Sequence, residues 1–122
     1  MVGGSGARST APYVPESGDL VWLSFDPQAG REQAGRRPAL ILSPASYNGR
    51  TGLALACPIT SQVKGYPFEV ALPSGLAVSG VVLADHIRSL DWRVRRAVLA
   101  GVAPSDVLDE VIARLEPLLG LR

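Results

Sequence analysis

One short segment, residues 31–37, gathers the side chains best suited to phosphate chemistry. It holds a carboxylate, an amide and three guanidinium groups, carried by Arg31, Glu32, Gln33, Arg36 and Arg37. A guanidinium group binds phosphate well because it offers paired donors and a permanent charge. Glycines before and within the segment mark it as a loop, and polar loops on rigid strands often carry recognition or chemistry. The same composition also fits a solvated surface loop, so these residues by themselves leave both interpretations open.

The elements that must position this loop are short strands. Apolar runs recur at 20–25, 39–42, 53–59, 68–72, 81–84, 87–90 and 98–102, with Pro, Gly, Asn and Ser between them. Turn signals stand at 46–49 and 73–75. Many short strands separated by turns predict a small β-barrel or sandwich. The loop at 31–37 would then lead into the second strand.

One helix is predicted near the C-terminus. Pro104 is suited to its first position, and Ser105 and Asp106 are suited to its first turn. Apolar residues from 107 to 119 keep the spacing of a single helix face, and Pro117 should kink or end the regular helix. We expect this helix to pack on the barrel or on a partner subunit.

The overall composition limits the class of protein. With 122 residues the chain is one domain with a modest core. Neither a membrane-spanning segment nor a signal peptide is recognisable, and the single cysteine, Cys57, excludes an internal disulfide and is expected to be buried. We therefore predict a cytoplasmic protein. Residues 1–12 read as a disordered lead or a cloning remnant, followed by one domain over 13–122.

Positive charge is concentrated in the middle of the chain, although the net charge is only +1. Residues 27–103 carry four acidic side chains (Glu32, Glu69, Asp85, Asp91) and nine basic ones (Arg31, Arg36, Arg37, Arg50, Lys64, Arg88, Arg93, Arg95, Arg96). Such an excess suits a few phosphates and not the coating of a duplex. An arginine-rich surface without a binding role would explain the scarcity of lysine equally well.

Five blocks of the sequence resemble, in order, those of the MazF/PemK/Kid toxin superfamily. They are the block Glu32-Gln33, Gly35 and Arg37-Pro38, preceded by Gly18-Asp19-Leu20-Val21-Trp22 and followed by Pro58-Ile59-Thr60, residues 64–70 and residues 84–92. The resemblance extends over residues 13–120, nearly the whole chain. It implies a mainly β fold, an SH3-like small barrel of the PemK/Kid/CcdB type with a C-terminal α-helix. It also implies the endoribonuclease half of a toxin–antitoxin pair.

Metal-free RNA cleavage needs a base for the 2′-hydroxyl, a proton donor for the leaving oxygen and positive charge for the phosphorane. The chain has one histidine and one cysteine, so we predict no metal site and no cofactor, and a two-histidine mechanism is impossible. By the resemblance, Arg37 and Thr60 are catalytic. Because the ordinary pKa of arginine is far above neutral, the main role expected of Arg37 is to stabilise negative charge, and acting as a general acid would need an unusual environment. Glu32 is a candidate base, or a salt-bridge partner that shapes the loop.

A second set of residues is predicted to bind RNA, since bases of a single strand are read by stacking and by bonds to their edges. The set comprises Arg31, Gln33, Arg36, Tyr47, Arg50, Lys64, Tyr66, Asp85 and Arg88. By the resemblance, Asp85 matches an acidic catalytic position of the Kid branch. That branch also has a catalytic arginine where this chain has Leu83, so the sequence favours a MazF-like mechanism that uses Arg37 and Thr60. His86 is read as a surface or loop residue, with proton transfer as the lesser alternative. Two interpretations of Trp92 are open: a position in a dimer interface, or one in the wall of the RNA-binding site.

The resemblance further implies the substrate and the partners. We expect cleavage of single-stranded RNA at a short motif, with ACA as one example, to leave 2′,3′-cyclic phosphate and 5′-hydroxyl ends. The expected partners are a second copy of the chain and a MazE-like antitoxin with an acidic disordered tail. Two alternatives are a CcdB-like gyrase poison, whose working Trp-Gly-Ile end is absent here, and a non-catalytic RNA-binding barrel.

Overall fold

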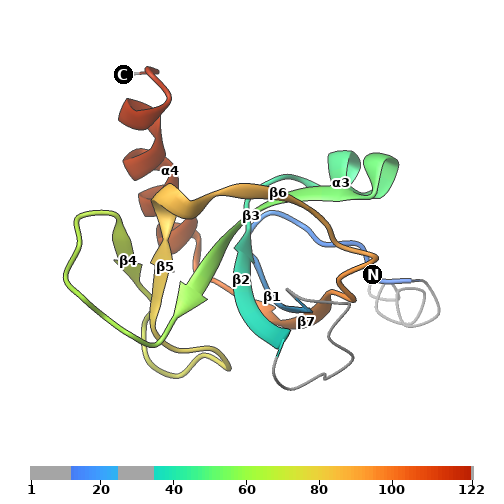
Figure 1. Ribbon diagram of the computed structural model, residues 1–122, viewed down its shortest axis with the longest axis horizontal. Coiled ribbons are helices and arrows are strands. Elements are labelled where there is room, and N and C mark those ends of the chain that lie inside the picture. The colour runs from blue at the N-terminus through green and yellow to red at the C-terminus, as the bar shows by residue number, and fades with distance from the viewer. Residues whose placement is uncertain (1–11, 25–34, 122) are drawn as a thin grey trace.

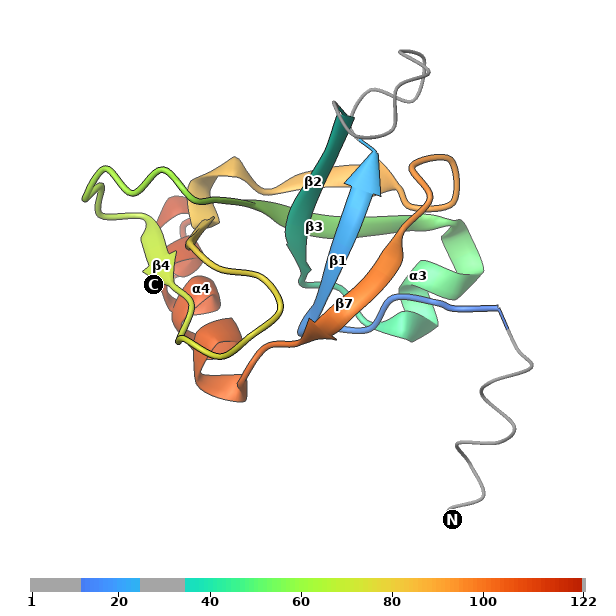
Figure 2. The same cartoon turned by 90° about the horizontal axis from the view of Figure 1, so that it is seen from below.

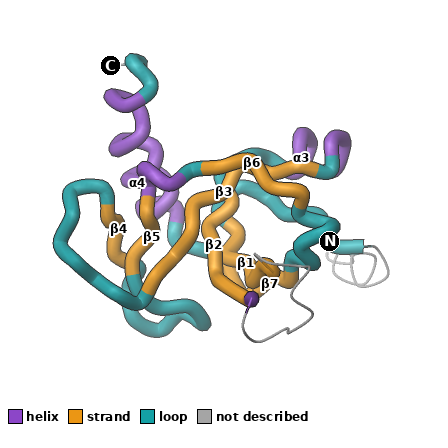
Figure 3. The backbone as a smooth tube through the Cα atoms, viewed as in Figure 1, coloured by secondary structure: helices purple, strands orange, loops and turns teal. Residues whose placement is uncertain are grey.

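A curved antiparallel sheet with a helix at the C-terminus forms the protein, in a computed structural model that describes residues 12–24 and 35–121 (Figure 1). The strands are β1 (Asp19–Ser24), β2 (Arg36–Ile41), β3 (Leu53–Thr60), β4 (Glu69–Ala71), β5 (Val81–Leu83), β6 (Arg88–Asp91) and β7 (Val98–Val102). The helices are α3 (Ala45–Thr51), the 3-10 turn η1 (Ala84–His86) and α4 (Ser105–Leu118). Figure 3 shows how helices, strands and loops follow one another.

The mainly β fold class and the C-terminal helix are confirmed. A strand lies within or across each of the seven predicted apolar runs, and α4 begins directly after Pro104. The helix ends at Leu118, one residue after Pro117, as expected of a ring that cannot continue the hydrogen-bonding pattern. Residues 1–11 lie outside the described residues, so the interpretation of the N-terminal lead stays a prediction. In the described part of the chain, no helix has the length and apolar character needed to cross a membrane.

Strand β3 organises the sheet because it changes partner along its length. The main strand order is β4-β5-β3-β2-β1-β7, and β6 also pairs with β3. The first half of β3, from Leu53 to Ala56, pairs with β6, and its last two residues, Ile59 and Thr60, pair with β5. Figure 2 shows β1 between β2 and β7, with β3 beyond β2. The end of β3 therefore belongs to a different part of the sheet from its beginning.

Two apolar clusters hold the sheet, one on each face of β1 and β2. Leu20 and Leu40 belong to the cluster that α4 covers with Val107, Val111 and Leu115. Their neighbours along the strands face the other cluster, whose buried members are Val21, Leu23, Ala39, Ile41, Ala54, Ala56, Leu90 and Trp92. This alternation follows from the two-residue period of a strand. Both faces of β1 and of the second half of β2 (residues 39–41) are buried, so this part of the sheet forms a rigid support.

The predicted turn at residues 46–49 is wrong, because these residues lie in helix α3. Asn48 is fully buried there: its amide donates to the carbonyls of Pro15 (2.8 Å) and Ser43 (2.9 Å), and its side-chain oxygen accepts from the Ser43 hydroxyl. Gly52 then ends the helix at a φ of 77°, a conformation that glycine adopts without strain. An Asn-Gly pair therefore serves here as a buried anchor and not as a hairpin turn.

Both interpretations of Trp92 are wrong as well. Its side chain is only 6% exposed, lies in the second cluster and donates a hydrogen bond of 2.9 Å to the backbone carbonyl of Asn48. Arg93 stacks on the indole, with its guanidinium carbon 4.6 Å from the ring centroid. The tryptophan therefore ties helix α3 to the sheet.

Replacing Asn48 by alanine should lower the free energy of unfolding by about 2 to 4 kcal/mol, because it leaves two buried carbonyls and a buried hydroxyl without their partner. Urea unfolding measures the change. Arg50→Ala, an exposed position on the same helix, is the control and should change stability by less than about 0.5 kcal/mol. Equal effects of the two substitutions would contradict the anchoring role of Asn48.

Candidate functional site

The candidate site lies where β2 and β3 part. The two strands pair at Ile41–Ala56, Leu40–Cys57 and Ala39–Pro58, and the pairing stops there. Pro38 and Pro58 have no amide hydrogen, so neither can donate to a neighbouring strand. Beyond this point β3 pairs with β5, while β2 keeps only β1. The sheet therefore opens into a wedge between the start of β2 and the end of β3.

The register of the ladder places the two predicted catalytic residues on opposite sides of this wedge. Extended by two pairs beyond Ala39–Pro58, the same register sets Arg37 opposite Thr60. Both residues line one cleft of about 620 Å³. Its other lining residues are Trp22, Arg36, Pro38, Ile59, Ser61, Gln62, Ala77, Val78 and Ser79. The structure thus brings Arg36, Arg37 and Thr60 together, as the sequence predicts.

The cleft is suited to an anion. Its described lining residues include two guanidinium groups and no carboxylate. Arg37 is exposed on β2, so its guanidinium can reach a ligand. The Thr60 hydroxyl oxygen accepts a hydrogen bond of 3.1 Å from the Gln62 amide, which leaves the hydroxyl hydrogen to be donated to a bound phosphate oxygen. A fixed positive charge and a hydroxyl donor therefore face the same space.

A second, smaller hollow of about 160 Å³ adjoins the cleft. It shares Thr60 and Gln62 with the cleft and is otherwise lined by Lys64, Tyr66, Glu69, Leu83 and His86. The Lys64 ammonium lies 5.9 Å from the centroid of the Tyr66 ring. Lys64 and Tyr66, both predicted to bind RNA, thus lie next to the threonine.

Gly80 sets the position of Thr60, a role that no sequence pattern predicted. A Cβ atom at Gly80 would lie 2.8 Å from the carbonyl carbon of Thr60 and closer still to its oxygen, and the φ of +119° is strained for any side chain. The backbone carrying Thr60 therefore packs directly on residue 80, which only glycine permits. The only local sign of this close packing in the sequence is a Ser-Gly pair directly before an apolar strand.

Other predicted site residues lie elsewhere. Tyr47 and Arg50 are on α3, at the opposite end of β3 from Thr60, and Arg88 is on β6, outside both hollows (Figure 1). Asp85, in η1, is outside the two linings, and its carboxylate lies 3.8 Å from the His86 ring. The predictions for Arg31, Glu32 and Gln33 fall on residues outside the described ranges.

Sequence reasoning also missed one wall of the cleft. Ala77, Val78 and Ser79 approach the site from the segment before β5, and such a long-range approach leaves no local pattern. Trp22 packs against the cluster that α4 covers and also lines the cleft. Cys57 is buried as expected, and burial, aided by the charge of Asp85, raises the pKa of its thiol to about 12. Among the described residues, no three His, Cys, Asp or Glu side chains gather in a possible metal site.

The fold and the cleft define a small β domain whose site presents arginine and threonine to an anionic ligand. A family model for the PemK-like, MazF-like toxin of type II toxin–antitoxin systems matches residues 16–119. The chain is 50% identical over 108 residues to the endoribonuclease toxin MazF of Escherichia coli K12, covering 88% of this chain and 96% of that protein. It therefore belongs to the PemK-like, MazF-like family of toxins, as the sequence blocks predict.

Solved structures support the same assignment. The MazE-MazF structure from Deinococcus radiodurans is 62% identical, with a TM-score of 0.83, covering 91% of this chain and all of that one. A structure of MazF from the same organism is 69% identical, with a TM-score of 0.81, and the match covers 89% of this chain and 99% of that one. The endoribonuclease PemK of Escherichia coli is a more distant relative, at 36% identity over 108 residues.

Replacing Gly80 by alanine should destabilise the protein more than the same change at another glycine of positive φ. Gly75 has a φ of +95°, and no atom lies within 4 Å of the place that a Cβ would take there, so Gly75→Ala carries only the backbone strain of about 1 to 2 kcal/mol. Gly80→Ala adds the collision with Thr60 and should cost about 3 kcal/mol or more in urea unfolding. Equal losses would show that the close approach to Thr60 does not constrain the site.

Proposed function

We propose that this protein is the toxin of a type II toxin–antitoxin system and acts as an endoribonuclease on single-stranded RNA. The observation that carries the proposal is the convergence of Arg37 and Thr60, from two strands, on one cationic cleft. Relatives at 50% and 36% identity are endoribonucleases by name, which adds independent support. Cleavage at a short motif such as ACA would stop translation and growth in the cytoplasm.

The proposed mechanism is attack of a 2′-hydroxyl on the adjacent phosphorus without a metal ion. Arg37 stabilises the negative charge that grows on the phosphorane, because its guanidinium is permanently charged and forked. Thr60 donates its hydroxyl hydrogen to a phosphate oxygen, since the Gln62 amide already occupies one lone pair. The bond from phosphorus to the 5′-oxygen of the following nucleotide breaks, and that oxygen takes a proton from solvent water, so the products carry 2′,3′-cyclic phosphate and 5′-hydroxyl ends. Glu32 remains the proposed base.

Recognition of bases is assigned to the residues around the two hollows. Tyr66 offers a ring for stacking and Lys64 a cation for a flanking phosphate, next to the threonine. Arg36 in the cleft contributes to binding, as do Arg31 and Gln33 by the family resemblance. The remaining predicted contacts, from Tyr47, Arg50, Asp85 and Arg88, lie outside both hollows, and we give them a lesser part.

Two protein partners complete the proposal. A solved relative is a complex of MazE with MazF, which supports a MazE-like antitoxin whose acidic tail covers the cationic cleft. We also propose a homodimer. Relatives named as endoribonucleases favour catalysis over a CcdB-like gyrase poison or a silent RNA-binding barrel.

Replacing Arg37 by alanine should lower the rate of RNA cleavage by about 100- to 1000-fold, because one charge-stabilising group is lost from the site. The assay uses a mixed-sequence single-stranded RNA with excess EDTA, and the wild type should still cut at one short motif. Arg96→Ala is the matched control, because it removes the same charge from an exposed turn outside both hollows and should change the rate by less than about twofold. Intact RNA with the wild type would refute the nuclease, and cutting abolished by EDTA would refute the metal-free mechanism.

Substitutions of Thr60 should separate its hydroxyl from its shape. Thr60→Ser keeps both the donor and the acceptor for the Gln62 amide, so cleavage should stay within about threefold of the wild type. Thr60→Val keeps the volume but removes the hydroxyl, and the loss of a bond to a charged oxygen should slow cleavage by about 10- to 100-fold. Single-turnover rates at saturating RNA measure both. Equal activity of the serine and valine variants would exclude the hydroxyl from the reaction.

A further inference from the structure

The loop between β3 and β4, residues 61–68, forms one lip of both hollows. Gln62 borders the cleft and the second hollow, and Lys64 and Tyr66 border the second hollow. Residues 61–67 are all exposed. A segment that buries so little surface is not held by packing, so its hydrogen bonds determine how well it is ordered.

The first arm of this loop is held from within the sheet. The Thr60 hydroxyl accepts the Gln62 amide at 3.1 Å. The carboxylate of Glu69, at the start of β4, accepts the amides of Lys64 at 3.1 Å and Gly65 at 2.9 Å. These bonds fix the turn that carries Lys64.

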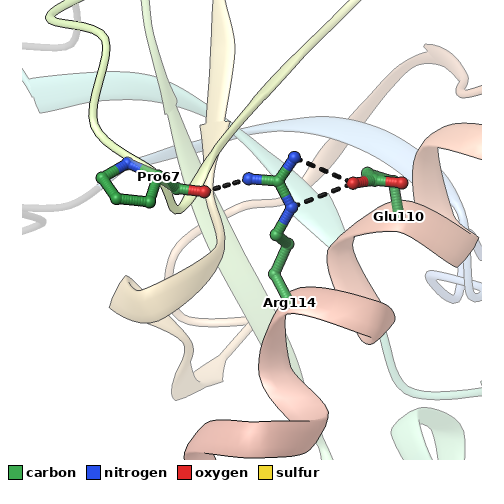
Figure 4. Close-up of polar contacts among 3 residues, drawn as sticks. All are labelled: Pro67, Glu110 and Arg114. Carbon is green, nitrogen blue, oxygen red and sulfur yellow. Dashed lines mark hydrogen bonds and ion pairs between the residues drawn. The ribbon is translucent and has the colours of Figure 1, made fainter.

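The second arm is held from the C-terminal helix. Arg114 of α4 donates a hydrogen bond from Nη1 to the backbone carbonyl of Pro67, 47 positions earlier in the chain (Figure 4). Its Nε and Nη2 atoms both lie 2.9 Å from the Glu110 carboxylate oxygen Oε2. A half-exposed ion pair contributes little by itself, but this one fixes the plane of the guanidinium and directs the remaining nitrogen at the loop.

The support of this contact is rigid. On α4, Val107, Val111 and Leu115 are buried in the first apolar cluster. The helix therefore cannot move away from the sheet without exposing that cluster, and the guanidinium is fixed relative to β3. Tyr66 is the residue directly before the anchored Pro67, so its ring stays over the second hollow.

We propose that Arg114, aimed by Glu110, is a positioning residue that holds the 61–68 loop in its RNA-binding conformation. This inference depends on the proposed function for its effect on catalysis. Arg114 lines neither hollow and acts only through the loop. Without the contact, RNA must order the loop as it binds, which weakens binding. Arg37 and Thr60 lie on strands and keep their geometry, so the chemical step is unaffected.

Steady-state kinetics on a single-stranded RNA containing the cleaved motif should separate binding from chemistry. Arg114→Ala should raise KM by about 3- to 10-fold and leave kcat within about twofold. Asp109→Ala, an exposed charge on the same helix, is the matched control and should change neither constant by more than about twofold. An unchanged KM, or a fall in kcat alone, would overturn the positioning role.

Glu110→Ala distinguishes positioning from simple charge attraction, because the two predict opposite signs of the change in KM. Removing an acidic group makes the surface more positive, so charge attraction alone would lower KM. Loss of the group that aims Arg114 should instead raise KM, by about 2- to 5-fold. A lower KM in this variant would overturn the proposal.

A readout without RNA keeps this inference separate from the proposed function. Lys64 is the only lysine of the chain, so a lysine-specific protease cuts only in this loop. Arg114→Ala should speed that cut by about 5-fold or more in the native protein, while Asp109→Ala should not. Val111→Ala removes apolar contacts from the buried face of α4 but keeps the hydrogen bond from Arg114 to Pro67. It therefore shows how much of a faster cut comes from global unfolding. Unchanged proteolysis refutes the anchoring, whereas a wild type that cuts no RNA refutes only the nuclease.

Discussion

The pairing of β2 with β3 stops after Ala39–Pro58, where Pro38 has no amide hydrogen to donate to β3, and the rest of the site depends on that break. Because β3 then pairs with β5, the sheet opens between two strands that are both rigid. A continuous ladder would have brought Arg37 and Thr60 side by side on a closed surface. The break separates them by a cleft while the register keeps them opposite each other. Gly80 completes the arrangement, because the backbone of Thr60 can lie against residue 80 only where no side chain intervenes.

The charge of the protein has more than one role. Arg93 stacks on Trp92 and donates to the carbonyl of Gly49, and Arg95 donates to the carbonyl of Ser24. These guanidinium groups fasten the connection between β6 and β7 to the rest of the fold. The cationic excess in the middle of the sequence is therefore partly structural. Among the residues described, Arg36 and Arg37 are the arginines that line the cleft, so their effect on an anionic ligand is local and not that of a broad basic surface.

The sequence predicted the seven strands and the final helix because each buries a regular apolar pattern that is visible locally. The pairing of Arg37 with Thr60 came from the family resemblance, and the structure adds the register that explains it. What could not be predicted depends on distant contacts. Helix α3 was not predicted because its Asn-Gly pair is typical of a turn, whereas in the fold the asparagine is buried against Pro15 and Ser43. The sequence around Trp92 likewise does not indicate that its hydrogen-bond partner lies in that same helix. The wall at residues 77–79 likewise reaches the cleft only through the fold.

The residues proposed for catalysis and those proposed for base recognition stand on different kinds of structure. Arg37 and Thr60 stand on β2 and β3, whose buried residues belong to both apolar clusters, so the core fixes the backbone that carries them. Lys64 and Tyr66 stand on an exposed loop that the core does not hold and that hydrogen bonds from Glu69 and Arg114 must order. If the loop binds RNA as proposed, substitutions in it would change which bases fit beside Thr60 without disturbing the strands. Under the proposed roles, a toxin built in this way would alter the RNA sequence it recognises while it keeps a single cleavage chemistry, and helix α4 would link the two through Arg114.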